Sequence, residues 1–264
     1  MSQRMPNDFS PFQASSPSPA PSRGKAGLIA IAVTLVTLCA LAAVLNETAF
    51  RIKQVAVVGN AYRTWQEIID LAGIDGRQTY FTVSEQQIAD GINSDRYLRF
   101  DKMEKHFPNG LTIYVTERRP VCSVQEGSAT YLLAADGMVL NRVNDMVTYE
   151  GIIQVTGLKP KDMRLGAVMV AGTAERQQAY LDIVSEIILQ GFQDQVSELN
   201  LMDSDSLKLV TWDGYTARLG DGTELRAKIG TLRGVIAKLR EMGETKGVIE
   251  ASIPGEATYM PPSP

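Results

Sequence analysis

Residues 107–120 read FPNGLTIYVTERRP, and this stretch decides the fold of the first part of the chain. The Pro-Asn-Gly tripeptide at 108–110 is a typical hairpin turn. Apolar and polar side chains alternate along residues 111–116, so one face of this strand is buried. We therefore predict an antiparallel hairpin whose first strand covers residues 97–107.

Upstream of this hairpin the sequence predicts one strand and two short helices. Residues 51–58 (RIKQVAVV) have the composition of a strand and end at a Gly-Asn break. Two capping patterns follow, Thr64 with Glu67 and Ser84 with Gln87, and each opens a helix. The order strand, helix, helix, strand, strand predicts a two-layer α+β unit with its helices on one face of the sheet.

Residues 26–45 (AGLIAIAVTLVTLCALAAVL) carry no charge. A helix of that length spans roughly 30 Å, the thickness of one hydrocarbon core. It is apolar on all sides, whereas a buried core helix has a single apolar stripe. A signal peptide cleaved after Ala40-Leu41-Ala42, leaving Ala43 as the N-terminus, is the alternative, but the run exceeds the roughly 7–15 residues of a signal core. We interpret it as an uncleaved transmembrane helix.

The segments on either side of this helix set its expected orientation. Residues 1–25 form a Pro- and Ser-rich tail that cannot bury enough apolar surface to fold. The tail carries three basic residues and one acidic residue, so the positive-inside rule places it in the cytoplasm. From Asn46 onward the chain has 23 basic and 29 acidic residues, a balance that disfavours nucleic-acid binding.

Residues able to perform enzyme chemistry are few. The single histidine, His106, falls in the strand before the hairpin, with no cysteine near it in the sequence. Cys122 is the only cysteine after the apolar run, so no disulfide can form within that part of the chain. Gly220-Asp221-Gly222 is better explained as a turn than as a dinucleotide site, because Leu225 occupies the third glycine position. We predict no catalytic, metal-binding or cofactor-binding residue. An anchored enzyme stays an alternative, and replacing His106 would test it.

Beyond residue 120 the sequence predicts a second, larger domain of strands and helices. Strand signals fall at 131–133, 139–140, 153–158, between 196 and 218, and at 247–253. Residues 175–190 and 224–242 have helical periodicity. The second of these helices carries a basic face, which we interpret as solvent-exposed: Arg226, Lys228, Arg233, Lys238 and Arg240. The pattern predicts a mixed β domain over residues 120–260 and a short tail at 261–264.

Three groups of residues carry a resemblance to a known family. They are Val57 to Asn60 at the first strand, Phe107 to Ile113 at the hairpin, and the exit motif Val115, Glu117, Arg118 and Pro120. Together with the preceding span, they resemble the FtsQ/DivIB family of bacterial cell division proteins. The resemblance covers about residues 26–260, with Glu250 where the family usually has Asp. It implies a POTRA domain at 50–119 and a β domain at 120–260.

The resemblance implies a non-enzymatic scaffold of the division machinery, without a cofactor. It would sit in the plasma membrane through residues 26–45, at the division septum, with its folded domains outside the cytoplasm. The implied partners are small single-span coiled-coil proteins of the FtsL and FtsB/DivIC types and, through them, the septal peptidoglycan synthase. The alternative is a POTRA-type peptide-binding module in secretion or envelope assembly.

We expect a partner to bind by strand addition at the C-terminal edge, where unpaired N–H and C=O groups are available. The expected strand is 247–253 with the residues that follow it to 260. The candidate partner-binding residues, several of which fall where partner contacts cluster in the family, are Val248, Ile249, Ala251, Ile253, Gly255, Tyr259 and Met260. Alternatively, Tyr259 and Met260 pack back onto the β domain or lie in a frayed terminus.

Overall fold

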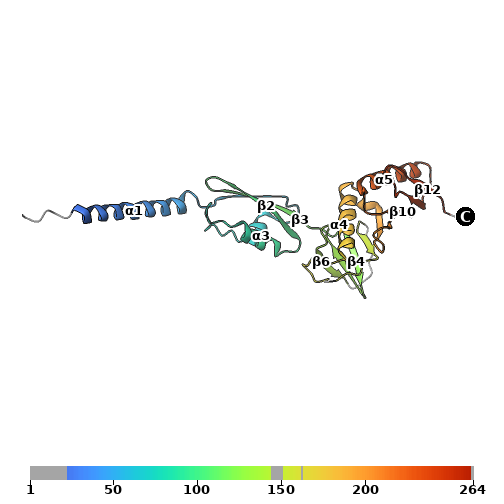
Figure 1. Cartoon of the computed structure of the whole chain (residues 1–264), viewed down its shortest axis with the longest axis horizontal. Helices are drawn as coiled ribbons and strands as arrows, with labels where there is room; N and C mark the ends of the chain where they lie inside the picture. The colour runs from blue at the N-terminus through green and yellow to red at the C-terminus, as the bar shows by residue number, and fades with distance from the viewer. Residues whose placement is uncertain (1–22, 144–150, 162, 263–264) are drawn as a thin grey trace, which may run out of the picture.

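The computed structural model describes residues 23–143, 151–161 and 163–262 (Figure 1). A long helix, α1 (Arg23–Thr48), precedes two separate β-sheet units, and this arrangement confirms the α+β class. Most of the predicted N-terminal tail lies outside the described residues. We name the two units after their sheets, the three-stranded unit and the nine-stranded unit.

Helix α1 projects away from both sheets as a straight rod (Figure 1). Its segment Gly27–Thr48 is long and apolar enough to cross a membrane, and none of its apolar window is buried against the rest of the protein. The hydroxyls of Thr34 and Thr37 donate to carbonyl oxygens four residues earlier, at 2.9 and 2.8 Å. These bonds satisfy the only polar side chains of the apolar run without water.

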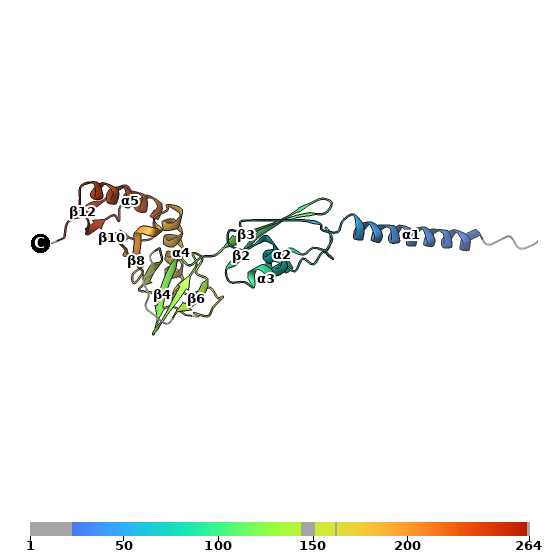
Figure 2. The same ribbon diagram turned by 180° about the vertical axis from the view of Figure 1, so that it is seen from behind.

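The three-stranded unit has the predicted element order. Its elements are β1 (Gln54–Val58), α2 (Trp65–Leu71), α3 (Glu85–Asn93), β2 (Leu98–His106) and β3 (Gly110–Glu117). The sheet order is β1-β3-β2, with β1 parallel and β2 antiparallel to β3. Both helices lie on one face of the sheet (Figure 2) and bury Ile68, Ile88 and Ile92 against it.

The predicted caps explain where these two helices begin. The Glu67 amide donates to the Thr64 hydroxyl at 3.3 Å, and the Thr64 amide donates to the Glu67 carboxylate at 2.9 Å. This reciprocal pair satisfies two of the donors that a helix N-terminus leaves unpaired. In α3 the Gln87 amide donates to the Ser84 hydroxyl at 3.4 Å. Local side-chain chemistry therefore places both helix starts.

The nine-stranded unit follows directly. Its elements are β4 (Cys122–Glu126), β5 (Ala129–Leu133), β6 (Val139–Val143), β7 (Ile153–Thr156), α4 (Ala174–Leu189), a 3₁₀ turn (Gln193–Gln195), β8 (Val196–Asn200), β9 (Leu207–Thr211), β10 (Tyr215–Gly220), α5 (Leu225–Glu241), β11 (Gly247–Glu250) and β12 (Thr258–Met260). The sheet order is β12-β11-β10-β9-β8-β7-β4-β5-β6. Helices α4 and α5 bury apolar stripes in one common core with these strands.

Two strands differ from the sequence-based prediction. The sequence gives no clear signal for β4, which lies inside the sheet between β5 and β7. The strand expected at 247–253 ends at Glu250, and the chain then turns back and adds β12 alongside β11. The outermost strand at this end of the sheet is therefore β12.

One residue of the predicted basic face of α5 is buried. Lys228 is 1% exposed, and its ammonium donates to the Asp221 carboxylate at 2.7 Å and to the Asp221 carbonyl oxygen at 3.0 Å. The bond from Lys228 is the main cause that lowers the pKa of Asp221 to about 2. The Gly-Asp-Gly turn thus binds a lysine at the start of α5, and Lys228 does not belong to the exposed face that we expected.

The exit motif joins the two units. The Glu117 carboxylate accepts three backbone N–H bonds, from Ala61, Tyr62 and Arg63, at 2.8 to 2.9 Å. The Arg118 side chain, 10% exposed, donates to Asp136 of the nine-stranded unit at 2.8 Å and also to the carbonyl oxygen of Leu98. One residue of the motif therefore fixes a loop, and the next one ties both units together.

The close approach of α2 and α3 depends on Gly91. A Cβ at this position would lie 2.1 Å from the carbonyl oxygen of Leu71. We predict that Gly91→Ala lowers the free energy of unfolding of the three-stranded unit by about 1–3 kcal/mol, because the helices must move apart. The matched control is Gly234→Ala in α5, where the Cβ meets nothing within 4 Å. This control should raise stability by about 0.5–1 kcal/mol. Urea unfolding measures both, and an unchanged Gly91→Ala variant would contradict the packing described.

The Glu117 carboxylate makes stability depend on pH. Partial burial raises its pKa, but the three backbone N–H donors outweigh this effect, so the pKa lies below the usual value. A carboxyl with a lowered pKa stabilises the fold above its unfolded pKa of about 4.3, and this stabilisation is lost as pH falls through the folded pKa. We predict that Glu117→Gln destabilises the protein at neutral pH and that the difference shrinks towards pH 3.

Thermal unfolding of the wild type and this variant from pH 7 to pH 3 measures the effect. Glu126→Gln, at the exposed end of β4, is the control and should change stability little. A Glu117→Gln effect that grows as pH falls would contradict the assignment.

Candidate partner-binding site

The C-terminal edge of the nine-stranded sheet is built by β11 and β12. Strand β11 pairs in parallel with β10 and antiparallel with β12, with Val248 opposite Met260 and Ile249 opposite Tyr259. In the part of the chain that the structure describes, β12 pairs on one side only. Its other side therefore presents backbone groups to which a further strand can add.

The predicted contact residues divide into three groups. Ile249 and Ala251 are completely buried and pack in the core of the nine-stranded unit. Val248, Tyr259 and Met260 lie across the paired strands, and Met260 is 40% exposed. Ile253, 57% exposed, and Gly255, with a φ of +81°, belong to the turn that connects the strands.

Tyr259 is fixed to the protein at its hydroxyl end. The hydroxyl shares its single proton between two acceptors, the Glu244 carboxylate at 3.0 Å and the Lys246 carbonyl oxygen at 2.8 Å. Burial, followed by the bond with Glu244, raises the pKa of Tyr259, so the hydroxyl stays a neutral donor. The ring packs against the main core. Tyr259 thus positions β12, and Met260 and Ile253 offer the exposed apolar side chains.

Gly247 allows β12 to close against β11. A Cβ there would lie 2.6 Å from the Tyr259 ring and 2.7 Å from the Met260 carbonyl oxygen, and the φ of +144° also disfavours other residues. Gly247 and Glu244 were not among the residues predicted from the sequence, and both position this edge. A glycine at the start of a strand was the available signal for a close backbone approach.

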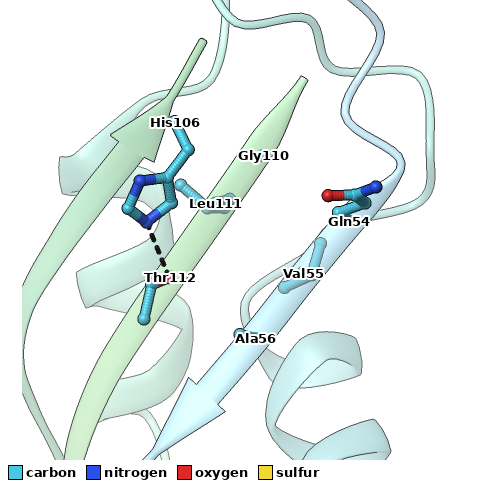
Figure 3. Close-up of a pocket in the computed structure, with 7 residues that line it drawn as sticks. All are labelled: Gln54, Val55, Ala56, His106, Gly110, Leu111 and Thr112. Carbon is cyan, nitrogen blue, oxygen red and sulfur yellow. Dashed lines mark hydrogen bonds between the residues drawn. The ribbon is translucent and has the colours of Figure 1, made fainter. Parts of the chain in front are cut away.

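A second edge lies in the three-stranded unit, beside a shallow hollow (Figure 3). The hollow is lined by Gln54, Val55, Ala56, His106, Gly110, Leu111 and Thr112. Strand β1 borders the hollow and pairs only with β3 among the described strands. The helices lie behind the sheet in this view, so the hollow is on its open face. His106 shares a 2.9 Å hydrogen bond with the Thr112 hydroxyl.

The charged groups on this open face bond to one another. Glu104 accepts bonds from the Lys102 ammonium at 2.6 Å and from the Tyr114 hydroxyl at 3.0 Å. Both bonds lower the pKa of Glu104, and the bond with Lys102 has the larger effect. The Lys102 ammonium also lies 4.4 Å from the centroid of the Tyr114 ring. The face is a network of mutually satisfied surface groups.

In the described part of the chain, Cys122 and His106 are not arranged as a nucleophile with a neighbouring base. Cys122 is completely buried, and burial raises the pKa of its thiol to about 12, so it stays protonated. The other residues that line the hollow beside His106 include no carboxylate, serine or cysteine, and the nearby Glu104 carboxylate is bonded to Lys102 and Tyr114. Over the described ranges, no group of three or more His, Cys, Asp or Glu side chains is placed to hold a metal ion.

The role of Gly247 gives a direct test of the edge. We predict that Gly247→Ala detaches β12, because the added methyl group overlaps Tyr259 and Met260. Hydrogen exchange by mass spectrometry should show faster exchange in 247–260 and unchanged exchange in the three-stranded unit. Gly222→Ala is the control, since a Cβ there meets nothing within 4 Å. Equal protection of residues 247–260 in both variants would show that Gly247 does not hold the edge.

Comparison with known proteins gives matches over both units. A family profile described as "POTRA domain, FtsQ-type" matches residues 50–118, and one described as "Cell division protein FtsQ/DivIB, C-terminal" matches residues 123–251. The chain is 22% identical over 222 residues to the cell division protein DivIB of Clostridium tetani, covering 84% of this chain and 81% of that protein. It is also 22% identical over 214 residues to DivIB of Bacillus subtilis, covering 79% and 73%. The match to the cell division protein FtsQ of Myxococcus fulvus is 28% over 181 residues, covering 67% and 61%.

Proposed function

The chain belongs to the FtsQ/DivIB family of cell division proteins, and we propose that it is an anchored scaffold that docks a partner strand on β12. The observation that carries the proposal is the free edge of β12 beside the exposed side chains of Met260 and Ile253. Backbone pairing supplies general affinity at such an edge, and the neighbouring side chains supply specificity.

The edge is short, and its sequence limits what can bind. Strand β12 has three residues, and Pro261 and Pro262 follow it. Proline has no N–H, so pairing cannot extend regularly past Met260. An added strand therefore gains few backbone bonds, and contacts with Met260 and Ile253 must contribute much of the affinity. The partner that fits is an extended segment with apolar side chains at alternate positions.

We propose that the partners are single-span proteins of the FtsL and FtsB/DivIC types, which would connect the scaffold to the septal peptidoglycan synthase. In this proposal α1 spans the plasma membrane, the N-terminus is cytoplasmic, and both sheet units lie outside. The excess of basic residues before the span supports this orientation. A partner with its own membrane helix would be confined to the same surface, which raises its effective concentration at the edge.

A second candidate function rests on β1 of the three-stranded unit, which matches the POTRA profile and which we call the POTRA unit from here on. Its free edge and the adjacent hollow offer an alternative place for an extended peptide (Figure 3). This arrangement is the structural basis for the alternative of a peptide-binding module in secretion or envelope assembly. The two edges lie in different units and can be tested separately.

We predict that the chain loses partner binding when β12 is removed or blocked. One variant ends at Ala257, and another is Met260→Lys, because lysine is a residue that protects edge strands from pairing. If the edge is the main binding site, each change should cost about 2 kcal/mol or more, which is roughly thirty-fold in Kd. Co-purification and titration with the extracytoplasmic segments of the two partners provide the measurement.

Ala56→Lys on β1 is the matched control and should leave binding unchanged. Circular dichroism first confirms that each variant is folded. Loss of binding in Ala56→Lys, with binding intact in the β12 variants, would favour the alternative at β1. Equal capture by all variants would overturn strand addition at both edges.

A further inference from the structure

Four aromatic rings cluster at one end of the POTRA unit. They come from three separate segments: Phe50 directly after α1, Tyr80 and Phe81 before α3, and Phe107 in the β2–β3 turn. Phe50 lies 5.1 Å from Phe81 and 5.6 Å from Phe107 between ring centroids, and Tyr80 lies 5.7 Å from Phe107. We call these four residues the aromatic cluster.

Two residues of the aromatic cluster are largely exposed, and the other two, Phe50 and Tyr80, are half-buried. Phe81 is 64% exposed and Phe107 is 70% exposed. None of the four rings belongs to the hydrophobic core of the POTRA unit, which lies between the sheet and the helices. Grouped exposed phenylalanines give little folding stability, and such patches mark sites of interaction.

The cluster lies next to the apolar helix. One residue, Ala49, separates Phe50 from the end of α1, and Phe50 is five residues beyond Leu45, the end of the uncharged run. Five residues of helical rise cover about 7 Å, and the headgroup layer on each side of a bilayer is roughly 5–8 Å thick. Phe50 therefore falls within the headgroup layer if α1 spans the membrane. The β2–β3 turn is at the end of the unit that faces α1 (Figures 1 and 2).

Basic side chains surround the cluster. Arg51, Lys53 and Lys105 are exposed. Arg51 pairs with Glu47 at 2.9 Å, and the Lys105 ammonium donates to the carbonyl oxygens of Tyr80 and Val83 at 3.2 and 2.9 Å. Exposed aromatic rings beside lysine and arginine are the combination by which proteins bind bilayer surfaces.

We propose that the aromatic cluster rests in the outer headgroup layer of the bilayer, with Phe81 and Phe107 inserted at the interface. The inference rests on the membrane anchor of the proposed function. We take the lipid surface as the binding partner of the aromatic cluster because Phe50 is tethered to the span. Contact between the cluster and the bilayer therefore costs little entropy and needs no second protein. The contact fixes the POTRA unit end-on to the membrane and holds β12 at the opposite end of the molecule, away from the lipid (Figure 1).

Tryptophan reporters test the proposal in the full chain, incorporated into nanodiscs that contain brominated lipid. Bromine quenches only tryptophans that reach the acyl chains or their upper boundary. Trp65 and Trp212, both partly exposed, are first replaced by Phe.

Phe107→Trp then reports on the cluster, with Phe81→Trp as a second reporter in case one variant misfolds. Tyr62→Trp, 89% exposed and beside Glu117 at the other end of the unit, is the matched control. Leu35→Trp reports on the span itself.

We expect the Leu35→Trp, Phe107→Trp and Phe81→Trp reporters to lose most of their emission and shift to the blue, while Tyr62→Trp stays unquenched. Quenching of Leu35→Trp without quenching at either phenylalanine position would overturn this inference and leave the anchor intact. An unquenched Leu35→Trp would overturn the anchor, and the inference with it. Quenching of Tyr62→Trp as well would overturn the end-on orientation, because the unit would then lie along the bilayer.

Discussion

The Arg118 guanidinium connects the two halves of this molecule, and the other functional features depend on that connection. It is 10% exposed and bonds both to Asp136 of the nine-stranded unit and to backbone carbonyl oxygen in β2. A buried guanidinium with several acceptors has one favourable geometry, and losing an acceptor leaves an uncompensated charge. Glu117, immediately before it, fixes the loop that leads into α2 through three backbone bonds. The exit motif is therefore a structural joint between a sheet near the apolar helix and a sheet that carries the free edge.

The joint lies between two ends of the molecule that carry different features. The apolar helix and the aromatic cluster lie at one end, and β12 lies at the other (Figure 1). If α1 spans the membrane as proposed, this joint would hold the proposed docking edge at one distance from the membrane, whereas a flexible linker would spread the edge over many positions. The proposed partners, confined to the same membrane, would then meet the edge at a defined height. Rigid geometry can in this way contribute to selectivity without a large interface.

The sequence predicted those elements whose signals are local. The capping box of Thr64 and Glu67, the Pro-Asn-Gly turn and the stripes of α4 and α5 need only neighbouring residues, and the structure confirms them. Strand β4 was missed because its position is decided by pairing with β5 and β7, and its first three residues are all buried, which removes the alternation. The fold-back of β12 was missed because the glycine at the start of β11 signals a close approach but does not show that Tyr259 is the partner. The burial of Ile249 and Ala251 could have been predicted from the two-residue period of the extended segment 247–251, which places both side chains on one face.

The short length of β12 suits a docking edge better than a long strand would. A long exposed edge with apolar side chains pairs with any available strand and leads to aggregation. Three residues followed by two prolines give too few backbone bonds for stable pairing with an arbitrary segment. In the proposed function, a segment held close by its own membrane helix would gain the missing free energy from effective concentration, and its side chains would also have to fit Met260 and Ile253. The edge could therefore stay unpaired in isolation and still bind where the proposed partners are gathered, which is the behaviour that the proposed scaffold requires.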